Sequence, residues 1–272
     1  FLLNTLACRG GAVSTFSNVE QVVKGIIADV SHKGDDALIK YTKKFDGWNA
    51  TGKLEVPKAA IDAAYKKISK TDREVLKLAA SRIKTFHKKQ VQRSWTFKDE
   101  YGSILGQKVT PIEKVGIYVP GGKAAYPSTV LMNAIPARIA GVDEIIMVTP
   151  RPNGGGAISD YVLAAAKIAG VHRVFQIGGA QAIAALAFGT ETVPRVDKIT
   201  GPGNIYVATA KRLVYGVVDI DMIAGPSEIL IINDGTGNAS WMAADLLSQA
   251  EHDELASSIL LTTSREMAQA VS

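Results

Sequence analysis

From residue 115 onward, short apolar segments alternate with helical segments, and this alternation limits the possible folds more than any other feature of the chain. Strands separated by crossover helices are typical of a parallel sheet covered by helices. We expect strands at residues 115–119, 144–149, 173–177, 198–200, 228–233 and 258–263. We expect helices at residues 128–140, 158–169, 180–188 and 204–215. The sequence therefore predicts an α/β fold with Rossmann-like parallel sheets and crossover helices.

The first hundred residues have a helical pattern instead. Apolar residues at three- and four-residue spacing follow Asn18, which we expect to cap the first helix, and Gly34 is expected to end it. Pro57 is expected to open a third helix and Thr71 to cap a fourth. An N-terminal helical region is therefore predicted to precede the sheet.

A predicted β-hairpin, formed by residues 94–97 and 103–109, connects the helices to the α/β region. We accordingly divide the chain into residues 1–108, helical with the hairpin, and residues 109–272, the α/β region, with the boundary near Lys108. The chain starts without methionine and stops inside a helical pattern, so we expect both ends to be cut from a longer protein.

Composition excludes several classes of function. The net charge of +5 comes with acidic residues at helical spacing among the lysines, which is typical of solvated helix faces and not of a nucleic-acid-binding surface. No apolar run is long enough to span a bilayer, and no signal peptide is found. A single cysteine, Cys8, cannot form an internal disulfide and fits a reducing compartment, so we expect a cytoplasmic protein.

Three of the expected strands end in glycine-rich turns, at residues 120–122, 178–181 and 201–204. Ligands of open α/β sheets bind at the carboxyl ends of strands, where glycine lets backbone amides approach a phosphate. Gln181 and Asn204 open the following helices and are placed to bind a ribose or a nicotinamide. The chain contains no Gly-x-Gly-x-x-Gly fingerprint, and such turns are common in α/β proteins, so a nucleotide site and purely structural turns both remain open.

Gln249 and His252 are three residues apart in a helical segment, so they share one helix face. An imidazole and an oxygen donor in this arrangement form half of a site for a borderline metal ion such as zinc. A single histidine near a helix end also commonly caps a carbonyl or lies in solvent, and the spacing alone does not separate the two readings.

Ser227 precedes the strand that leads to this helix, where its hydroxyl is placed to contact a small polar substrate. Nothing in the sequence supplies the base that a nucleophilic serine requires, which argues against covalent catalysis.

Taken together, these motifs resemble the histidinol dehydrogenase family, the NAD-dependent zinc enzymes of the last two steps of histidine biosynthesis. The resemblance covers nearly the whole chain, and its motifs lie at residues 116–122, 178–190, 201–204, 220–228 and 245–252. It implies contacts to NAD by Tyr118, Gln181 and Asn204. It further implies that Ser227 contacts the substrate, and that Gln249 and His252 bind both zinc and substrate.

The resemblance also implies the reaction, which is oxidation of L-histidinol to L-histidine through L-histidinaldehyde with NAD. Family members continue beyond Ser272, where the Glu-His pair that accepts protons and the remaining zinc ligands lie, and they form an intertwined homodimer. We therefore expect no catalytic base in this chain and no activity of the chain alone. The alternatives are a dehydrogenase of the same family that oxidises another amino or hydroxy alcohol, and a nucleotide-binding transferase or non-catalytic α/β module.

Overall fold

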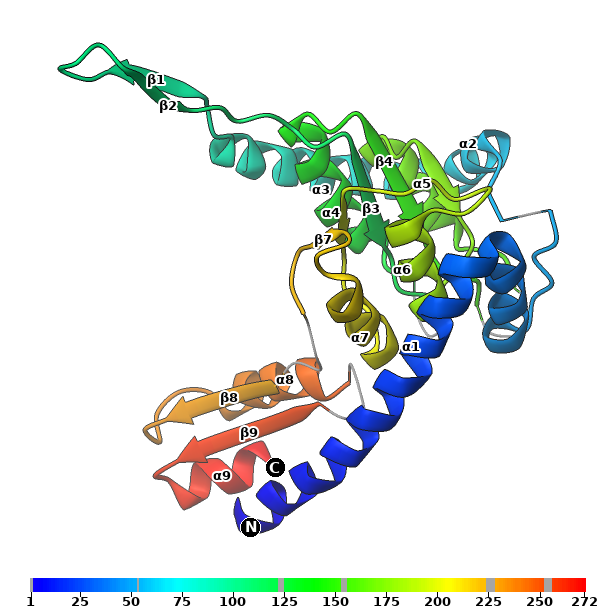
Figure 1. Cartoon of the computed structure of the whole chain (residues 1–272). Helices are drawn as coiled ribbons and strands as arrows, with labels where there is room; N and C mark the ends of the chain where they lie inside the picture. Colours follow the sequence, from blue (N-terminus) through cyan, green and yellow to red (C-terminus); the bar gives the residue numbers. More distant parts are fainter. Residues whose placement is uncertain (1, 53, 122–124, 153–155, 224–227, 252–255) are drawn as a thin grey trace. The chain divides into compact units, whose positions relative to one another are not determined.

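A computed structural model describes residues 2–52, 54–121, 125–152, 156–223, 228–251 and 256–272, with side chains from residue 18 onward (Figure 1). The chain divides into two compact units, Phe1–Ile223 and Ala224–Ser272. The boundary that we expect near Lys108 follows a change in sequence pattern and stays a prediction.

Unit 1 is built on a five-stranded sheet with the order β5-β4-β3-β6-β7, in which every neighbouring pair is parallel. Its strands are β3 (Lys114–Tyr118), β4 (Glu144–Val148), β5 (Arg173–Phe175), β6 (Lys198–Thr200) and β7 (Asp219–Ile220). The crossover helices are α4 (Pro127–Ala140), α5 (Asp160–Ala169), α6 (Gly179–Phe188) and α7 (Ile205–Val214). The predicted α/β fold with a parallel sheet is confirmed.

Helices cover both faces of this sheet, with α6 and α7 on the side of α1 (Figure 1). Successive strand residues point to opposite faces. Val115 and Ile117 accordingly pack in the core beneath α4 and α5, whereas Tyr118 belongs to the core beneath α1, α6 and α7. Gly116 leaves room for α6 to pack closely, because an added Cβ would lie 2.8 Å from Leu186 Cδ1 and would force that side chain to shift.

The first helix, α1 (Leu2–Asp46), consists of two arms separated by a non-helical residue, Gly34, with φ 51° and ψ −129°. The break expected at Gly34 is confirmed, but the expected cap at Asn18 is wrong because the helix continues through that position. An added Cβ on Gly34 would lie 2.3 Å from Glu191 Oε2, which accepts a hydrogen bond from the Asp35 amide at 2.8 Å. Only glycine adopts this backbone at no steric cost.

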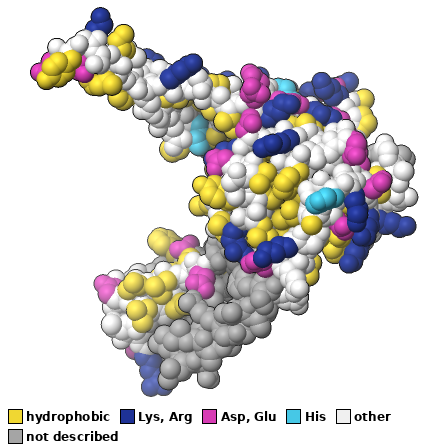
Figure 2. Space-filling view, in the orientation of Figure 1, with side chains coloured by type: hydrophobic (Ala, Val, Ile, Leu, Met, Phe, Trp, Pro, Cys, Tyr) yellow, Lys and Arg dark blue, Asp and Glu magenta, His cyan; other side chains and the backbone are white. Residues whose placement is uncertain are grey.

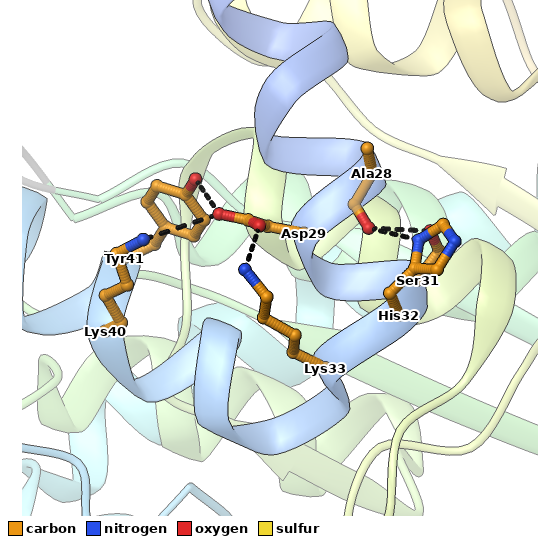
Figure 3. A network of polar contacts seen from close by, with 7 residues as sticks. All are labelled: Ala28, Asp29, Ser31, His32, Lys33, Lys40 and Tyr41. Carbon is orange, nitrogen blue, oxygen red and sulfur yellow. Dashed lines mark hydrogen bonds and ion pairs between the residues drawn. The ribbon is translucent and has the colours of Figure 1, made fainter.

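A polar network braces the two arms against each other (Figure 3). Asp29, in the first arm, accepts hydrogen bonds from Lys33 Nζ at 2.6 Å and from Tyr41 Oη of the second arm at 2.7 Å. Lys40 Nζ lies 3.4 Å from the same carboxylate. The hydrogen bonds from Lys33 and Tyr41 hold the pKa of Asp29 well below its usual range, so it stays ionised at neutral pH.

Two further helices, α2 (Lys58–Lys67) and α3 (Lys70–His87), pack against α5 and α4. Pro57 precedes α2 as expected. The cap of α3 is Ser69, whose side chain accepts from the Asp72 amide at 3.0 Å, so the expected cap at Thr71 is wrong.

The predicted hairpin is confirmed as β1 (Trp95–Lys98) and β2 (Ile104–Gln107), an antiparallel pair that follows the short helix η1 (Lys88–Gln90). All its strand residues are exposed, and hydrophobic side chains gather on it in Figure 2. Elsewhere in that view basic and acidic side chains are interspersed, without one continuous basic face.

Unit 2 pairs β8 (Glu228–Asn233) in parallel with β9 (Ser257–Thr262) and adds α8 (Ala239–Ala250) and α9 (Arg265–Val271). Asn238 caps α8 by accepting from the Ser240 amide at 2.9 Å. Both strands lie where the sequence predicted them. Across the described ranges of both units, no helix combines the length and apolarity needed to cross a bilayer.

Candidate nucleotide-binding site

A cavity of about 470 Å³ in unit 1 lies where β3 and β4 end and α6 and α7 begin. Its walls come from both arms of α1, the segments after β3 and β4, and the first turns of α6 and α7. The three residues predicted to contact NAD, Tyr118, Gln181 and Asn204, all line it. The structure therefore brings together side chains from three elements that are far apart in the sequence.

Tyr118, at the end of β3, is buried, and its hydroxyl accepts a hydrogen bond from the Gly179 amide at 3.1 Å. Burial, with a smaller contribution from the charge of Asp46, raises the pKa of Tyr118 to about 12. The phenol thus keeps its proton at neutral pH. Because the oxygen already accepts a bond from the protein, the hydroxyl hydrogen remains for donation to a ligand.

Gln181, in the first turn of α6, has a side chain that is only 1% exposed. Neither its Oε1 nor its Nε2 has a hydrogen-bond partner among the described residues. Leaving such a buried polar group unpaired costs about 1–3 kcal/mol. A ligand that presents both a donor and an acceptor, such as a carboxamide or a ribose hydroxyl, would satisfy this amide.

Asn204 is the N-cap of α7, and its Oδ1 accepts from the amides of Tyr206 and Val207, each at 3.1 Å. The oxygen is therefore occupied by the helix terminus. The Nδ2 group is left as the donor that the exposed side chain offers to a ligand, which restricts Asn204 to ligand groups that accept.

An ion pair between a buried lysine and an exposed aspartate fixes the loop that carries Asn204. Lys211, only 2% exposed, donates from Nζ to the Gly201 carbonyl at 2.9 Å and pairs with Asp221. Asp221 Oδ2 in turn accepts from the Gly201 amide at 2.8 Å. This support could not be predicted from the sequence, because no local pattern relates a helix lysine to the aspartate that follows β7.

We expected the glycine-rich turns to make room for a phosphate, but at several positions protein atoms fill the space of the missing side chain. A Cβ on Gly201, which has φ 113°, would lie 2.2 Å from the Tyr118 carbonyl oxygen. A Cβ on Gly178 would lie 2.4 Å from Pro150 Cβ. These glycines let the loops of the cavity pack against one another.

The kinked helix α1 contributes cavity residues that the site prediction missed. Val22 and Ile26 come from its first arm, and Phe45 and Asp46 from its second. Burial raises the pKa of Asp46 to about 6, and Asp46 Oδ2 has no hydrogen-bond partner among the described residues. The Phe-Asp-Gly motif that ends α1 was available as a signal, but only the kink reveals that it faces a cavity.

The predicted zinc and substrate residues belong to a different part of the chain. Gln249 lies in the last turn of α8 in unit 2 and is half-buried. His252 and Ser227 fall outside the described residues. Within the described ranges, no group of three or more His, Cys, Asp and Glu residues is arranged to hold a metal ion. The roles predicted for these three residues stay predictions.

A parallel sheet with a cavity at the carboxyl ends of its strands, lined by helix N-termini and by an amide without a partner among the described residues, defines an α/β protein with a candidate ligand site at the usual edge of the sheet. Comparison with known proteins narrows this class. The family model described as histidinol dehydrogenase matches residues 11–272, and the chain belongs to that family. The resemblance stated from the sequence motifs is thereby confirmed.

Individual proteins that match the chain carry the same family name. The chain is 62% identical over 253 residues to histidinol dehydrogenase from Geobacter sulfurreducens, covering 92% of this chain and 58% of the relative. It is 60% identical over 270 residues to the Aquifex aeolicus protein of that name, covering 99% and 61%. A crystal structure of histidinol dehydrogenase from Elizabethkingia anophelis matches with a TM-score of 0.84 at 40% identity, covering 95% of this chain and 62% of that one. The chain thus spans 58–61% of the length of these curated relatives.

Proposed function

We propose that this chain is the cofactor-binding part of an enzyme that oxidises L-histidinol to L-histidine through L-histidinaldehyde, with NAD as the hydride acceptor. One structural observation carries the cofactor assignment: the amide of Gln181 is buried without a partner among the described residues, on a cavity that Tyr118 and Asn204 also line. Family membership supports the substrate and the reaction.

In this proposal each side chain has a defined part in holding NAD. Gln181 both donates to and accepts from one polar group of the cofactor, whereas Tyr118 and Asn204 donate. The N-terminus of α6, which begins at Gly179, favours the negative pyrophosphate. The exposed rings of Phe45 and Tyr206 line the cavity and offer apolar contact to the bases. When bound, NAD supplies the hydride-accepting ring.

Oxidation of an alcohol also requires a proton acceptor near neutral pKa. Tyr118 does not provide it, because burial raises its pKa to about 12. We propose that the proton acceptors are the Glu-His pair that the family resemblance implies beyond Ser272. The chain by itself would then bind the cofactor without turning over the substrate.

We further propose that Gln249 and His252 bind zinc and substrate, and that Ser227 contacts the substrate. The family resemblance supports these roles, as does the position of Gln249 in the last turn of α8, close in sequence to His252. Zinc, when bound, would orient the substrate. A neutral amide is a weak ligand, which suits a site that must exchange its substrate. A homodimer of the full-length protein and a cytoplasmic location are parts of the same proposal.

Titration of NAD into the purified chain tests the cofactor assignment. Gln181→Leu keeps a similar volume but removes both unpaired polar atoms. We expect it to weaken NAD binding by about tenfold or more while raising the melting temperature, because a buried unsatisfied amide is lost. The control is Gln107→Leu on the exposed hairpin, which should leave NAD affinity unchanged. Equal NAD affinity in the two variants would contradict the proposal.

A further inference from the structure

We infer that Asp46 selects NAD over its 2′-phosphorylated form, NADP, by accepting hydrogen bonds from the hydroxyls of a cofactor ribose. The inference rests on the proposed NAD site and assigns a specificity-determining residue to it. It depends on a juxtaposition that the fold creates: the last residue of α1 lies on the same cavity as Tyr118 and Gln181.

The carboxylate of Asp46 has no partner within the described protein. Its Oδ2 atom is buried and accepts no hydrogen bond from any described residue. Two cations, Lys44 and Arg151, also line the cavity, but neither forms an ion pair with Asp46 in the part of the chain that the structure describes.

Both cations have other contacts. The guanidinium of Arg151 lies over the ring of Trp48, 4.5 Å from its centroid, and Arg151 Nε donates to the Gly156 carbonyl at 2.7 Å. Lys44 Nζ lies 5.2 Å from the centroid of the Phe45 ring. The buried oxygen of Asp46 is therefore available for a ligand.

The chemistry of a carboxylate identifies that ligand group. An ionised carboxylate only accepts hydrogen bonds, and a vicinal diol supplies two hydroxyl donors that match its two oxygens. In dinucleotide-binding α/β sheets an acidic side chain on the ribose hydroxyl favours NAD, whereas an arginine accommodates the 2′-phosphate of NADP. In NADP a phosphate replaces the 2′-hydroxyl, so Asp46 would lose a hydrogen-bond donor and would face a second negative charge. Such repulsion is one way in which a site excludes the wrong ligand.

Burial raises the pKa of Asp46 to about 6, so its carboxylate is mostly ionised at pH 8. The N-terminus of α6 remains available to the pyrophosphate that both cofactors share. The negative charge of Asp46 is then the feature of the cavity that distinguishes the two cofactors.

The test is calorimetric titration of NAD and of NADP into the purified chain at pH 8, for the unchanged chain, Asp46→Asn and Asp36→Asn. Asp36 is an exposed residue of the same helix and serves as the control that removes the same charge. The unchanged chain should bind NAD at least about tenfold more tightly than NADP, because a hydrogen bond to a charged group is worth about 1.5–3 kcal/mol. Asp36→Asn should keep this ratio.

Asp46→Asn should weaken NAD binding about tenfold and strengthen NADP binding, so that the ratio of the two affinities approaches one. Asp46→Ala should change the ratio in the same direction, which guards against a loss of folding peculiar to one variant. An unchanged ratio, or equal weakening of both cofactors, would overturn the role of Asp46 while leaving the NAD site in place. If the unchanged chain binds neither cofactor, the proposed site and this inference fail together.

Discussion

The two compact units are both built on parallel strands, yet they differ in how completely those strands are buried. In unit 1, four of the five residues of β3 and of β4 are buried. In unit 2, no residue of β8 or β9 is buried, and apolar side chains such as Leu230, Ile232 and Leu261 are 56%, 74% and 59% exposed. The same local structure is thus found with and without a core.

The difference shows what a parallel strand requires from its surroundings. Continuous apolar strands are stable when both faces of the sheet are covered, and isolated two-stranded sheets are marginal in water. Unit 1 meets this requirement with helices on both faces. Unit 2 has α8 and α9, but neither helix contains a buried residue among those described. Unit 1 therefore contains its own core, whereas the described helices and strands of unit 2 contain no buried residue.

Separating the units should produce the largest effect. We expect residues 1–223 to unfold in one cooperative transition and to bind NAD within about twofold of the whole chain, because the cavity lies entirely in unit 1. Residues 224–272 alone should lack stable structure. Circular dichroism, thermal unfolding and NAD titration of the two pieces measure this. If residues 224–272 alone unfold cooperatively, the low burial of unit 2 does not mean that it is unstable.

Within unit 1, replacing a glycine at the kink of α1 should lower the stability of the protein, whereas replacing one inside its first arm should not. Gly34→Ala places a Cβ against Glu191 at φ 51° and should lower the free energy of unfolding by about 1–3 kcal/mol. It should also weaken NAD binding, because both arms of α1 line the cavity. Gly25→Ala, in the first arm with open space around its Cβ, is the matched control.

The control should stabilise the protein by about 0.5–1 kcal/mol, since alanine is favoured over glycine inside a helix. Urea unfolding of the two variants gives both values. Similar effects of the two substitutions would show that the kink does not need glycine.

The smallest effect concerns pH. Burial raises the pKa of Asp46 from 3.8 to about 6, so the folded state holds this proton more tightly than the unfolded state. The favourable contribution of the protonated carboxyl to the free energy of unfolding is complete below about pH 4 and is lost as the pH rises through 6. Asp46→Asn, which stays neutral, should match the unchanged chain near about pH 3, below the pKa of this carboxyl in both the folded and the unfolded state. It should be more stable by on the order of 1 kcal/mol at pH 7.5, after allowance for solvent screening of a partly exposed group.

Unfolding in urea at both pH values measures this difference. Other carboxylates titrate alike in the two proteins, so their contributions cancel. A difference that is independent of pH would indicate that the carboxyl of Asp46 is solvated.

Much of the fold was predictable because the relevant signals are local. The strands that became β3, β4 and β8 were located to within one residue at each end, since short apolar runs bounded by turn residues are a local signal of a strand. The break at Gly34 also follows from one residue's backbone freedom. The expected caps at Asn18 and Thr71 were wrong because a capping side chain acts only where the helix actually begins.

Sequence by itself determined the alternation of strands and helices and the family, and its motifs indicated Tyr118, Gln181 and Asn204 as members of one site. Only the tertiary structure decided that Gln181 is buried with no hydrogen-bond partner in the described part of the chain, and that Asp46 lies on the same cavity. Burial and the absence of a hydrogen-bond partner are properties of a residue's surroundings. Here those surroundings come from α1, β3 and α6, which are distant in the chain and meet only when a kinked helix packs at the carboxyl edge of a parallel sheet.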